Sequence, residues 1–278
     1  MSADESSGTL YVVATPIGNL GDLTRRAEDV LTRVEIVAAE DTRRTSVLLD
    51  HIGHRVPNLL SYHEHNKMRM TSELLQRLVS GDDVALVSDA GTPLVNDPGA
   101  ELVAAATTAG LKVVPIPGAS AITAALSVCP FSCYPFTYMG FLPSKKSQRK
   151  QLLQDYLARE DALVFFESPH RILETLNNLA ELTNRQVLLG RELTKQFETI
   201  EIGTANEIIE RGIEARGEFV LIVELGAQTD ASPAEHRRVL KILLAELSPS
   251  QVARTAAAIL NTKKSVLYDL ALEMAKER

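Results

Sequence analysis

Acidic and basic side chains meet at the end of a short apolar run near the N-terminus. Glu40 and Asp41 come directly after the run Glu35–Ala39, and Arg43 and Arg44 follow them. A carboxylate can accept the proton of a reacting hydroxyl, and arginine favours phosphate, so the pattern predicts a proton acceptor beside an anion-binding surface. A strand-end turn with solvated charges has the same composition, and this alternative stays open.

A second set of polar and small residues forms the segment Ser88–Gly99, which follows a buried-strand pattern and contains Asp89 and Asp97. Open α/β sheets bind ligands beyond the carboxyl ends of their strands, so this loop is suited to cover a compact polar ligand. Asp97 precedes Pro98, and we assign the pair to the start of a helix, with Asp97 as its N-cap.

Two further loops follow strand patterns. The segment Ala14–Gly21 contains Gly18 and Gly21 but also Pro16, and it is a poor match to the dinucleotide-binding pattern G-x-G-x-x-G. The segment Pro117–Ala121 precedes a helix pattern, where backbone N–H groups favour an anion. A tight turn explains this segment equally well.

Strand and helix patterns that would position these loops alternate along the first half of the chain. Short β-branched runs predict strands at residues 10–14, 35–39, 59–63, 84–88 and 112–116. This alternation indicates βαβ units and a largely parallel sheet. The segment 129–143, rich in proline and aromatic residues, is predicted as the crossing into a second domain. Strand patterns with short connections follow it, so part of the second sheet is expected to be antiparallel.

The chain is therefore predicted to contain two α/β domains, residues 1–118 and 119–228, and a helical tail, residues 229–278. The turn 261–264 between the last two helix patterns has the spacing of a helix-turn-helix. The tail should form a small unit of its own around its apolar positions, which are Leu240, Leu243, Leu244, Val252, Ala256, Ile259, Leu260, Val266 and Leu270.

In order and spacing, these motifs resemble the tetrapyrrole methylase family. The likeness extends from Leu10 to about Leu272, and it is carried by the three loops together with Ala39–Arg43, Phe165–Arg171, Arg191–Lys195 and the tail. It implies an α/β fold with two domains of the tetrapyrrole methylase type, a cofactor cleft between them and a small helical C-terminal unit. The implied cofactor is S-adenosylmethionine.

The resemblance is strongest to members that methylate a cytidine ribose 2′-hydroxyl in small-subunit (16S) ribosomal RNA, and it implies this activity. The implied cofactor pocket is lined by Ile17, Thr92, Val95, Ser120, Ala121, Phe166, Phe219 and Val220. The implied catalytic groups are Glu40, Asp41 and Lys195, the last orienting the 2′-oxygen or a phosphate. The expected RNA contacts are Arg43, Arg44, Lys145, Lys146, Lys263 and Lys264. The partner would be free RNA or the assembled small subunit, and a homodimer is expected.

Composition sets bounds on these expectations. Hydrophobic residues make up 45% and charged residues 23%, as in an ordinary globular protein, but the net charge is −7. Proteins that wrap nucleic acid are usually basic, so local clusters such as Lys145, Lys146 and Arg149 would have to make the phosphate contacts.

The sequence predicts neither a metal site nor a membrane segment. Cys129 and Cys133 lack the further ligands of a zinc site and are expected as packed thiols, and His63 and His65 lack a third ligand. No signal peptide and no apolar run of about 20 residues is apparent, so a cytoplasmic protein is expected.

Two other functions remain open on the residues alone. Methylation of a tetrapyrrole would leave the basic clusters and the tail without a purpose. A ligand-sensing regulator with a DNA-binding tail is disfavoured because the last helix pattern carries Leu267, Asp269 and Glu273, whereas base recognition needs Arg, Lys, Asn or Gln.

Overall fold

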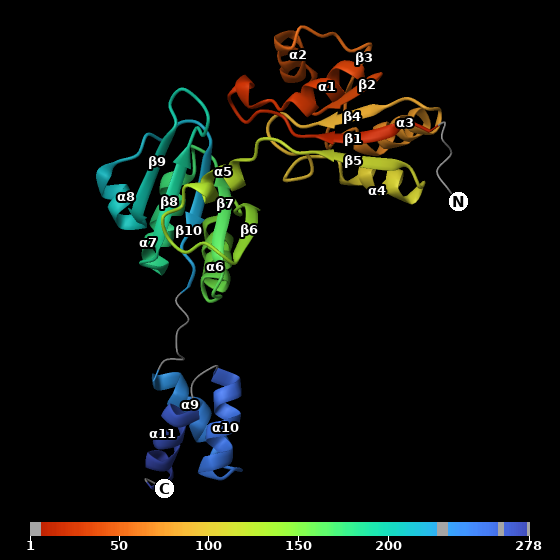
Figure 1. Ribbon diagram of the computed structural model, residues 1–278. Coiled ribbons are helices and arrows are strands. Elements are labelled where there is room, and N and C mark those ends of the chain that lie inside the picture. Colours follow the sequence, from red (N-terminus) through yellow and green to blue (C-terminus); the bar gives the residue numbers. More distant parts are fainter. Residues whose placement is uncertain (1–6, 227–232, 261–263, 277–278) are drawn as a thin grey trace. The chain divides into compact units, whose positions relative to one another are not determined.

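The computed structural model describes residues 7–226, 233–260 and 264–276. The chain divides into two compact units, Met1–Leu225 and Gly226–Arg278. In the described residues, the first unit holds two five-stranded sheets with their helices, and the second is helical (Figure 1). The predicted fold class, two α/β sheets followed by a helical C-terminal unit, is confirmed.

The first sheet is entirely parallel, with the order β3-β2-β4-β1-β5. Its strands are β1 (Thr9–Val13), β2 (Ile36–Ala39), β3 (Asn58–Ser61), β4 (Val84–Val87) and β5 (Lys112–Ile116). All five predicted strands are present. Because β1 lies between β4 and β5, the loops that follow these three strands emerge side by side at the carboxyl edge of the sheet.

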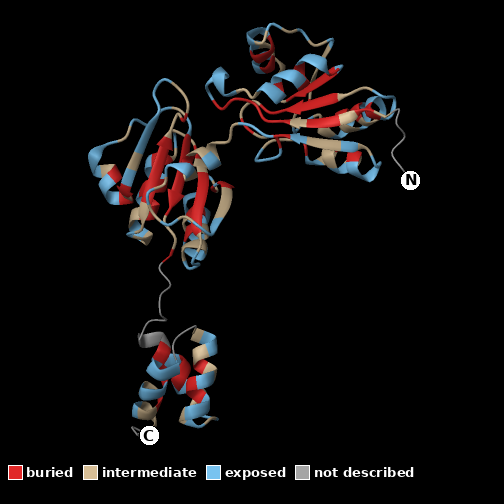
Figure 2. Cartoon of the chain, viewed as in Figure 1, coloured by how far each residue is buried: buried red, intermediate tan, exposed pale blue. Residues whose placement is uncertain are grey.

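Helices cover both faces of this sheet (Figures 1 and 2). In β1, Tyr11 and Val13 pack toward α1 (Arg25–Arg33) and α2 (Thr42–His51), while Leu10 packs toward α3 (Lys67–Val79) and α4 (Ala100–Thr108). Burial on both faces explains why the strands are continuous apolar runs. A short 3₁₀ turn, Leu20–Asp22, precedes α1, and the Thr24 side chain caps that helix by accepting from the Ala27 N–H.

The second sheet has the order β6-β7-β10-β8-β9, in which only the pair β6–β7 is parallel. Its strands are β6 (Phe136–Phe141), β7 (Ala162–Glu167), β8 (Gln186–Arg191), β9 (Thr199–Thr204) and β10 (Phe219–Val223). The predicted antiparallel part is confirmed. The strand β6 was not predicted, because its segment was interpreted as a domain crossing.

The two faces of the second sheet have different neighbours. Alternate residues of β10 point to α6 (Lys146–Leu157), α7 (Ile172–Leu182) and α8 (Ala205–Arg211) on one side and to α5 (Ala121–Ser127) on the other. On the α5 side, Val220 and Ile222 pack with Ala125, and Ile17 from the loop after β1 joins the same cluster. The loops of the first sheet are therefore packed against the second.

The C-terminal unit contains α9 (Pro233–Leu243), α10 (Pro249–Leu260) and α11 (Lys264–Lys276) around a core of Val239, Leu240, Val252, Ala256, Leu267 and Ala271. Two of the predicted core positions are wrong, since Ile259 and Val266 are exposed. Each lies one residue before a packed leucine, Leu260 or Leu267, and is turned about 100° away from it on the helix. None of the helices within the described ranges is long and apolar enough to cross a membrane.

Candidate active site

The loops after β1 and β4 are joined to each other by the backbone. The Thr15 N–H donates to the Gly91 carbonyl at 2.9 Å, the Gly91 N–H donates back at 3.0 Å, and the Thr15 hydroxyl donates to the Ser88 carbonyl at 3.1 Å. Gly91 has a φ of 79°, and a Cβ there would lie 3.3 Å from Ile17 Cγ2. Glycine therefore permits both the turn and the close approach of the two loops.

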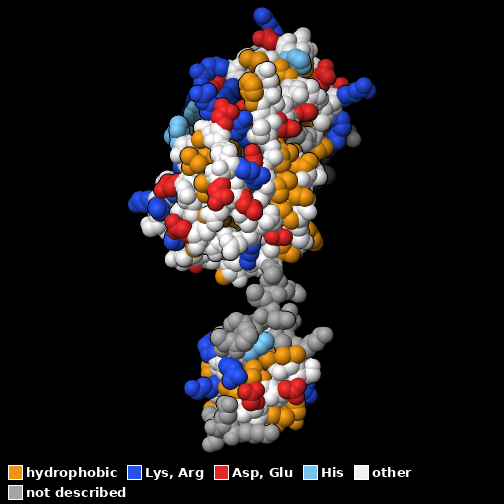
Figure 3. Space-filling model, turned by 90° about the vertical axis from the view of Figure 1, so that its left-hand side faces the viewer, with side chains coloured by type: hydrophobic (Ala, Val, Ile, Leu, Met, Phe, Trp, Pro, Cys, Tyr) orange, Lys and Arg blue, Asp and Glu red, His pale blue; other side chains and the backbone are white. Residues whose placement is uncertain are grey.

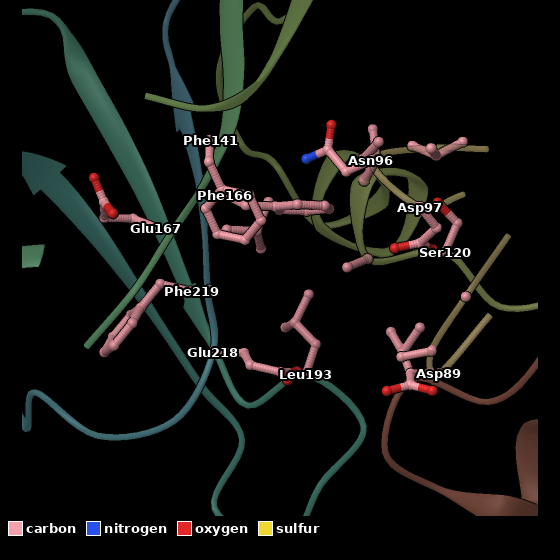
Figure 4. Close-up of a pocket in the computed structure, with 18 of the residues that line it drawn as sticks. Asp89, Asn96, Asp97, Ser120, Phe141, Phe166, Glu167, Leu193, Glu218 and Phe219 are labelled. Carbon is pink, nitrogen blue, oxygen red and sulfur yellow. The ribbon is translucent and has the colours of Figure 1, made fainter. Parts of the chain in front are cut away.

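A cavity of about 380 Å³ lies where these loops, the start of α5, the carboxyl ends of β7 and β8 and the start of β10 meet (Figure 4). This volume falls in the range of small-molecule sites, about 300–1,000 Å³. All eight residues that the sequence predicted for a cofactor pocket line it: Ile17, Thr92, Val95, Ser120, Ala121, Phe166, Phe219 and Val220. The ring of Phe219 packs into the core on the α7 side of the sheet.

Aromatic rings form one wall of the cavity. Phe166 packs against Phe141, with ring centroids 5.8 Å apart, and against Tyr138, with centroids 5.4 Å apart. Phe141 remains 57% exposed at the cavity rim. It was missed from the sequence because it belongs to β6. Apolar surface of this kind suits the adenine and sulfonium surroundings of a nucleoside cofactor.

A network of charged groups forms the opposite wall, at the carboxyl ends of β2 and β4. The Asp89 carboxylate accepts from the Asp41 N–H at 2.9 Å and pairs with Arg44 Nε at 3.4 Å, and the Asp89 N–H donates to Glu40 Oε2 at 3.3 Å. Glu40, Asp89 and Arg44 line the cavity. The structure thus brings Glu40, predicted as catalytic, and Arg44, predicted to bind RNA, to the same edge of the cavity.

Asp41 and Arg43 have a different arrangement. Asp41 caps α2 by accepting from the Arg43 N–H at 2.9 Å, and its carboxylate also binds the Arg43 guanidinium at 2.6 Å. These hydrogen bonds lower the pKa of Asp41 from 3.8 to about 2. The Arg43 side chain is largely solvent-exposed. Neither residue lines the cavity.

Asp97 does not cap a helix, so that prediction is wrong. The helix α4 starts at Ala100 after Gly99, which has a φ of 143°, and it has no side-chain cap. The loop turns earlier, at Leu94 and Asn96, each with a φ of 72°, and Asp97 lines the cavity (Figure 4). The sequence Asp97-Pro98-Gly99 is typical of a helix N-cap. In the structure, the turn at Leu94 and Asn96 places the Asp97 carboxylate at the cavity instead.

The surroundings of Asp97 perturb its titration. Burial raises its pKa from 3.8 to about 6, the charges of Glu40 and Asp89 add to this rise, and the Ser88 hydroxyl opposes it. The sequence contained a signal for this role: the loop Ser88–Gly99 has two acidic residues and is longer than a helix cap requires. The capping interpretation used only the last three residues of that loop.

Lys195 lies beside the cavity and does not line it. Its ammonium group pairs with Glu192 at 2.8 Å and with Glu218 at 3.0 Å, and Glu218 is a lining residue. The Lys195 stem covers Gly18, where a Cβ would overlap it. The lysine therefore links the loop after β1 to the loop after β8.

Glu167, at the end of β7, is 1% exposed and fully engaged. It accepts from the Thr175 hydroxyl at 2.7 Å, the Ser168 N–H at 2.8 Å and the Arg171 guanidinium at 2.9 Å. Glu167 and Arg171 thus form an ion pair between the end of β7 and the residue before α7. This network fixes the backbone of the cavity wall formed by Glu167, Ser168 and Pro169.

The remaining basic residues proposed for RNA are exposed where they are described. Lys145 and Lys146 lie at the start of α6, Lys264 opens α11, and Lys263 lies outside the described residues. Arg149 is fully buried and pairs with Glu174 at 2.9 Å, so its grouping with this cluster is wrong. On the face shown in Figure 3, basic and acidic side chains are interspersed.

In the described part of the chain, no group of three or more His, Cys, Asp or Glu side chains is placed to hold a metal ion. Cys129 and Cys133 are free thiols in partly buried positions, and burial raises the pKa of Cys129 to about 11. A thiol with such a pKa is protonated at neutral pH and is a poor nucleophile.

Comparison with known proteins agrees with this geometry. Residues 9–209 match the family described as Tetrapyrrole (Corrin/Porphyrin) Methylases, and residues 230–275 match the RsmI C-terminal HTH domain. The chain is 45% identical to Ribosomal RNA small subunit methyltransferase I of Escherichia coli O157:H7, over 98% of this chain and 97% of the relative. It is 43% identical to the protein of the same name from Pseudomonas aeruginosa, over 96% and 98% of the two chains.

The fold likeness extends to solved structures. Uroporphyrin-III C-methyl transferase from Thermus thermophilus, complexed with S-adenyl homocysteine, superposes with a TM-score of 0.54. That superposition covers 78% of this chain and 97% of the other, at 19% sequence identity, so it is a likeness of fold. From the family match over residues 9–209 and from the relatives that share nearly its full length, the chain belongs to the tetrapyrrole methylase family.

Proposed function

We propose that the protein transfers a methyl group from S-adenosylmethionine to the ribose 2′-oxygen of a cytidine in small-subunit (16S) ribosomal RNA. The observation that carries the proposal is the cavity of the first unit, lined by all eight residues expected to hold the cofactor. Relatives that share 43–45% of their residues with this chain are named ribosomal RNA small subunit methyltransferase I. The C-terminal unit matches a domain named after the same enzyme.

The cavity fits S-adenosylmethionine in chemistry as well as in volume. Ile17, Phe166 and Val220 offer apolar surface for the adenine and the sulfonium surroundings. Thr92 and Ser120 offer hydroxyl and backbone groups for the polar ends. When bound, the cofactor supplies an electrophilic methyl group, and the protein must hold the accepting hydroxyl in line with it and remove that hydroxyl's proton.

The predicted catalytic groups take two kinds of role in this proposal. Glu40 lines the cavity and would contact the substrate directly, with one carboxylate oxygen accepting from the Asp89 N–H. Asp41 and Lys195 act as positioning residues, because Asp41 holds Asp89 through its backbone N–H and Lys195 holds Glu218 through its ammonium. Arg44 stands at the cavity edge, where it can meet a phosphate of the bound RNA.

In this proposal, exposed arginine and lysine side chains outside the cavity also contact the RNA. Arg43 and Arg44 lie on α2, and Lys145 and Lys146 lie at the start of α6. Lys264, which is exposed at the start of α11, and Lys263, which precedes it in the sequence, would touch phosphate without reading bases. The interspersed acidic side chains limit the attraction at long range, so binding depends on docking rather than on net charge.

We also propose that the protein works in the cytoplasm as a homodimer. Large apolar side chains of the first unit remain exposed, including Tyr134 and Phe197, and a second copy could cover them. The two free thiols suit a reducing compartment. Sedimentation equilibrium at micromolar concentration tests the dimer, and a monomer at that concentration would remove it from the proposal.

The activity is tested with methyl-labelled S-adenosylmethionine, small subunits from a strain lacking the methylase, and the full-length protein in chelator. We expect label in the ribosomal RNA, recovered as 2′-O-methylcytidine by mass spectrometry and protecting one backbone linkage from alkaline cleavage. Parallel reactions contain naked ribosomal RNA, duplex DNA or a tetrapyrrole. Label in the tetrapyrrole alone, or label in a base instead of a ribose, would refute the proposal.

A further inference from the structure

Five carboxylates line the cavity: Glu40, Asp89, Asp97, Glu167 and Glu218. Four of them are held by backbone N–H groups or by cations. Glu40 and Asp89 belong to the charged network at β2 and β4, Glu167 to its buried network, and Glu218 to the pair with Lys195. The lone pairs of these four carboxylates are therefore already engaged by donors of the protein.

Asp97 differs from the other four. Among the described residues it is the only one of the five that neither accepts from a backbone N–H nor pairs with a cation, and its hydrogen-bonding neighbour is the Ser88 hydroxyl. It is partly buried at the cavity wall (Figure 4), and the charges of Glu40 and Asp89 act on it. A carboxylate that lines a cavity and has neither a backbone N–H nor a cation as its partner is free to exchange a proton with a bound ligand.

We infer that Asp97 is the general base that takes the proton from the ribose hydroxyl. This inference rests on the proposed function. As the 2′-oxygen bonds to the methyl carbon through its lone pair, the carbon–sulfur bond breaks and leaves its electron pair on sulfur. Asp97 accepts the hydroxyl proton in that step and later releases it to water.

The groups that face Asp97 favour this role. Glu40 and Asp89 contribute negative charge from β2 and from the loop after β4, and burial acts in the same direction, so the pKa of Asp97 rises to about 6. Tyr138, on β6, has its own pKa raised to about 12, by burial first and by the Asp97 charge second, so it stays neutral. Arg44 is engaged with Asp89. A base with a pKa near the working pH combines ionisation with basicity.

The test compares the full-length protein with Asp97→Asn, Asp97→Glu and a matched surface control, Glu210→Gln on α8, which is exposed. Small subunits are the substrate, and S-adenosylmethionine binding is followed by calorimetry. We expect Asp97→Asn to lower kcat by about 10²-fold or more while the cofactor Kd stays within about threefold, and Asp97→Glu to recover part of the rate. In the unsubstituted protein and the control, kcat should rise with pH through an inflection near 6 that Asp97→Asn removes.

A second readout does not depend on activity. With ¹³C-labelled aspartate, one carboxyl resonance should titrate near pH 6 in the unsubstituted protein and be missing in Asp97→Asn. Retained kcat in Asp97→Asn, the absence of that resonance, or a cofactor Kd that rises as much as kcat falls would each overturn the inference. The last result would make Asp97 a cofactor ligand. If the unsubstituted protein does not methylate small-subunit RNA, the proposed function fails instead.

Discussion

Asp97→Asn should stabilise the folded protein at neutral pH, although it should abolish most of the activity. The folded state binds a proton at Asp97 more tightly than the unfolded chain does, because the pKa is about 6 in the fold and 3.8 for an unperturbed aspartate. Between these two values the folded state holds more protons. The free energy of unfolding therefore falls as pH rises through this window and stays at the lower level above it. The side chain of asparagine is uncharged, so Asp97→Asn should not lose stability as the pH rises through this window.

The size of the effect follows from the shift. A difference of about two pH units corresponds to at most about 3 kcal/mol of lost stability above pH 7. Asp97 is only partly buried, so solvent screening reduces this to about 1–1.5 kcal/mol. For a chain of this length, such a gain in Asp97→Asn corresponds to a rise in Tm of about 2–6 °C.

Thermal unfolding at pH 7.5 and at pH 4.5, in the absence of cofactor, measures this difference. The Tm of Asp97→Asn should exceed that of the unsubstituted protein at pH 7.5, and most of the excess should disappear at pH 4.5. Glu210→Gln provides the control, because its side chain is exposed. An excess that is equal at both pH values, or a loss of stability at pH 7.5, would contradict a strained charge at Asp97.

Three other predictions concern the cavity and the second unit. Thr92→Trp should fill the cavity and weaken S-adenosylmethionine binding at least tenfold in calorimetry, with Tm nearly unchanged, whereas unfolding at unchanged affinity would make the loop structural. Glu167→Ala should lower the free energy of unfolding by about 3–5 kcal/mol in urea because it leaves Arg171 unpaired, and Glu167→Gln should lower it less. A chain that ends at Gly226 should bind cofactor normally but methylate small subunits much more weakly, most clearly at high salt; equal methylation would show that the tail does not dock RNA.

The fold was predictable where local pattern and tertiary structure agree. The five strands of the first sheet are buried on both faces, so a short apolar run is a sufficient signal for each. The strand β6 gave no such signal. Its residues are mostly half-buried or exposed, and Gly140 within it has a φ of 64°, so the strand is set by its pairing with β7 rather than by its own composition.

The candidate site was predictable to the extent that backbone loops form it. The eight positions expected to hold the cofactor lie in motifs of fixed order, and all of them line the cavity. Asp97 and Phe141 escaped this reasoning because their positions at the cavity arise from contacts between distant segments. The pKa of Asp97 is raised in part by the charges of Glu40, at the end of β2, and of Asp89, earlier in the same loop. Patterns of neighbouring residues in the sequence do not predict such an effect between separate segments.

Two loops that line the cavity, the one before α4 and the one after β8, contain residues in a strained backbone conformation. In the described residues, the non-glycine positions with positive φ are Leu94 and Asn96 before α4, and Glu192 and Thr194 after β8. A left-handed conformation costs an L-residue about 1–2 kcal/mol, so it persists only where packing enforces it. Both loops contribute residues to the cavity. A loop that only had to cap α4 would relax to a capped helix start. This one keeps two strained residues and an unpaired carboxylate, and a ligand site explains why both are retained.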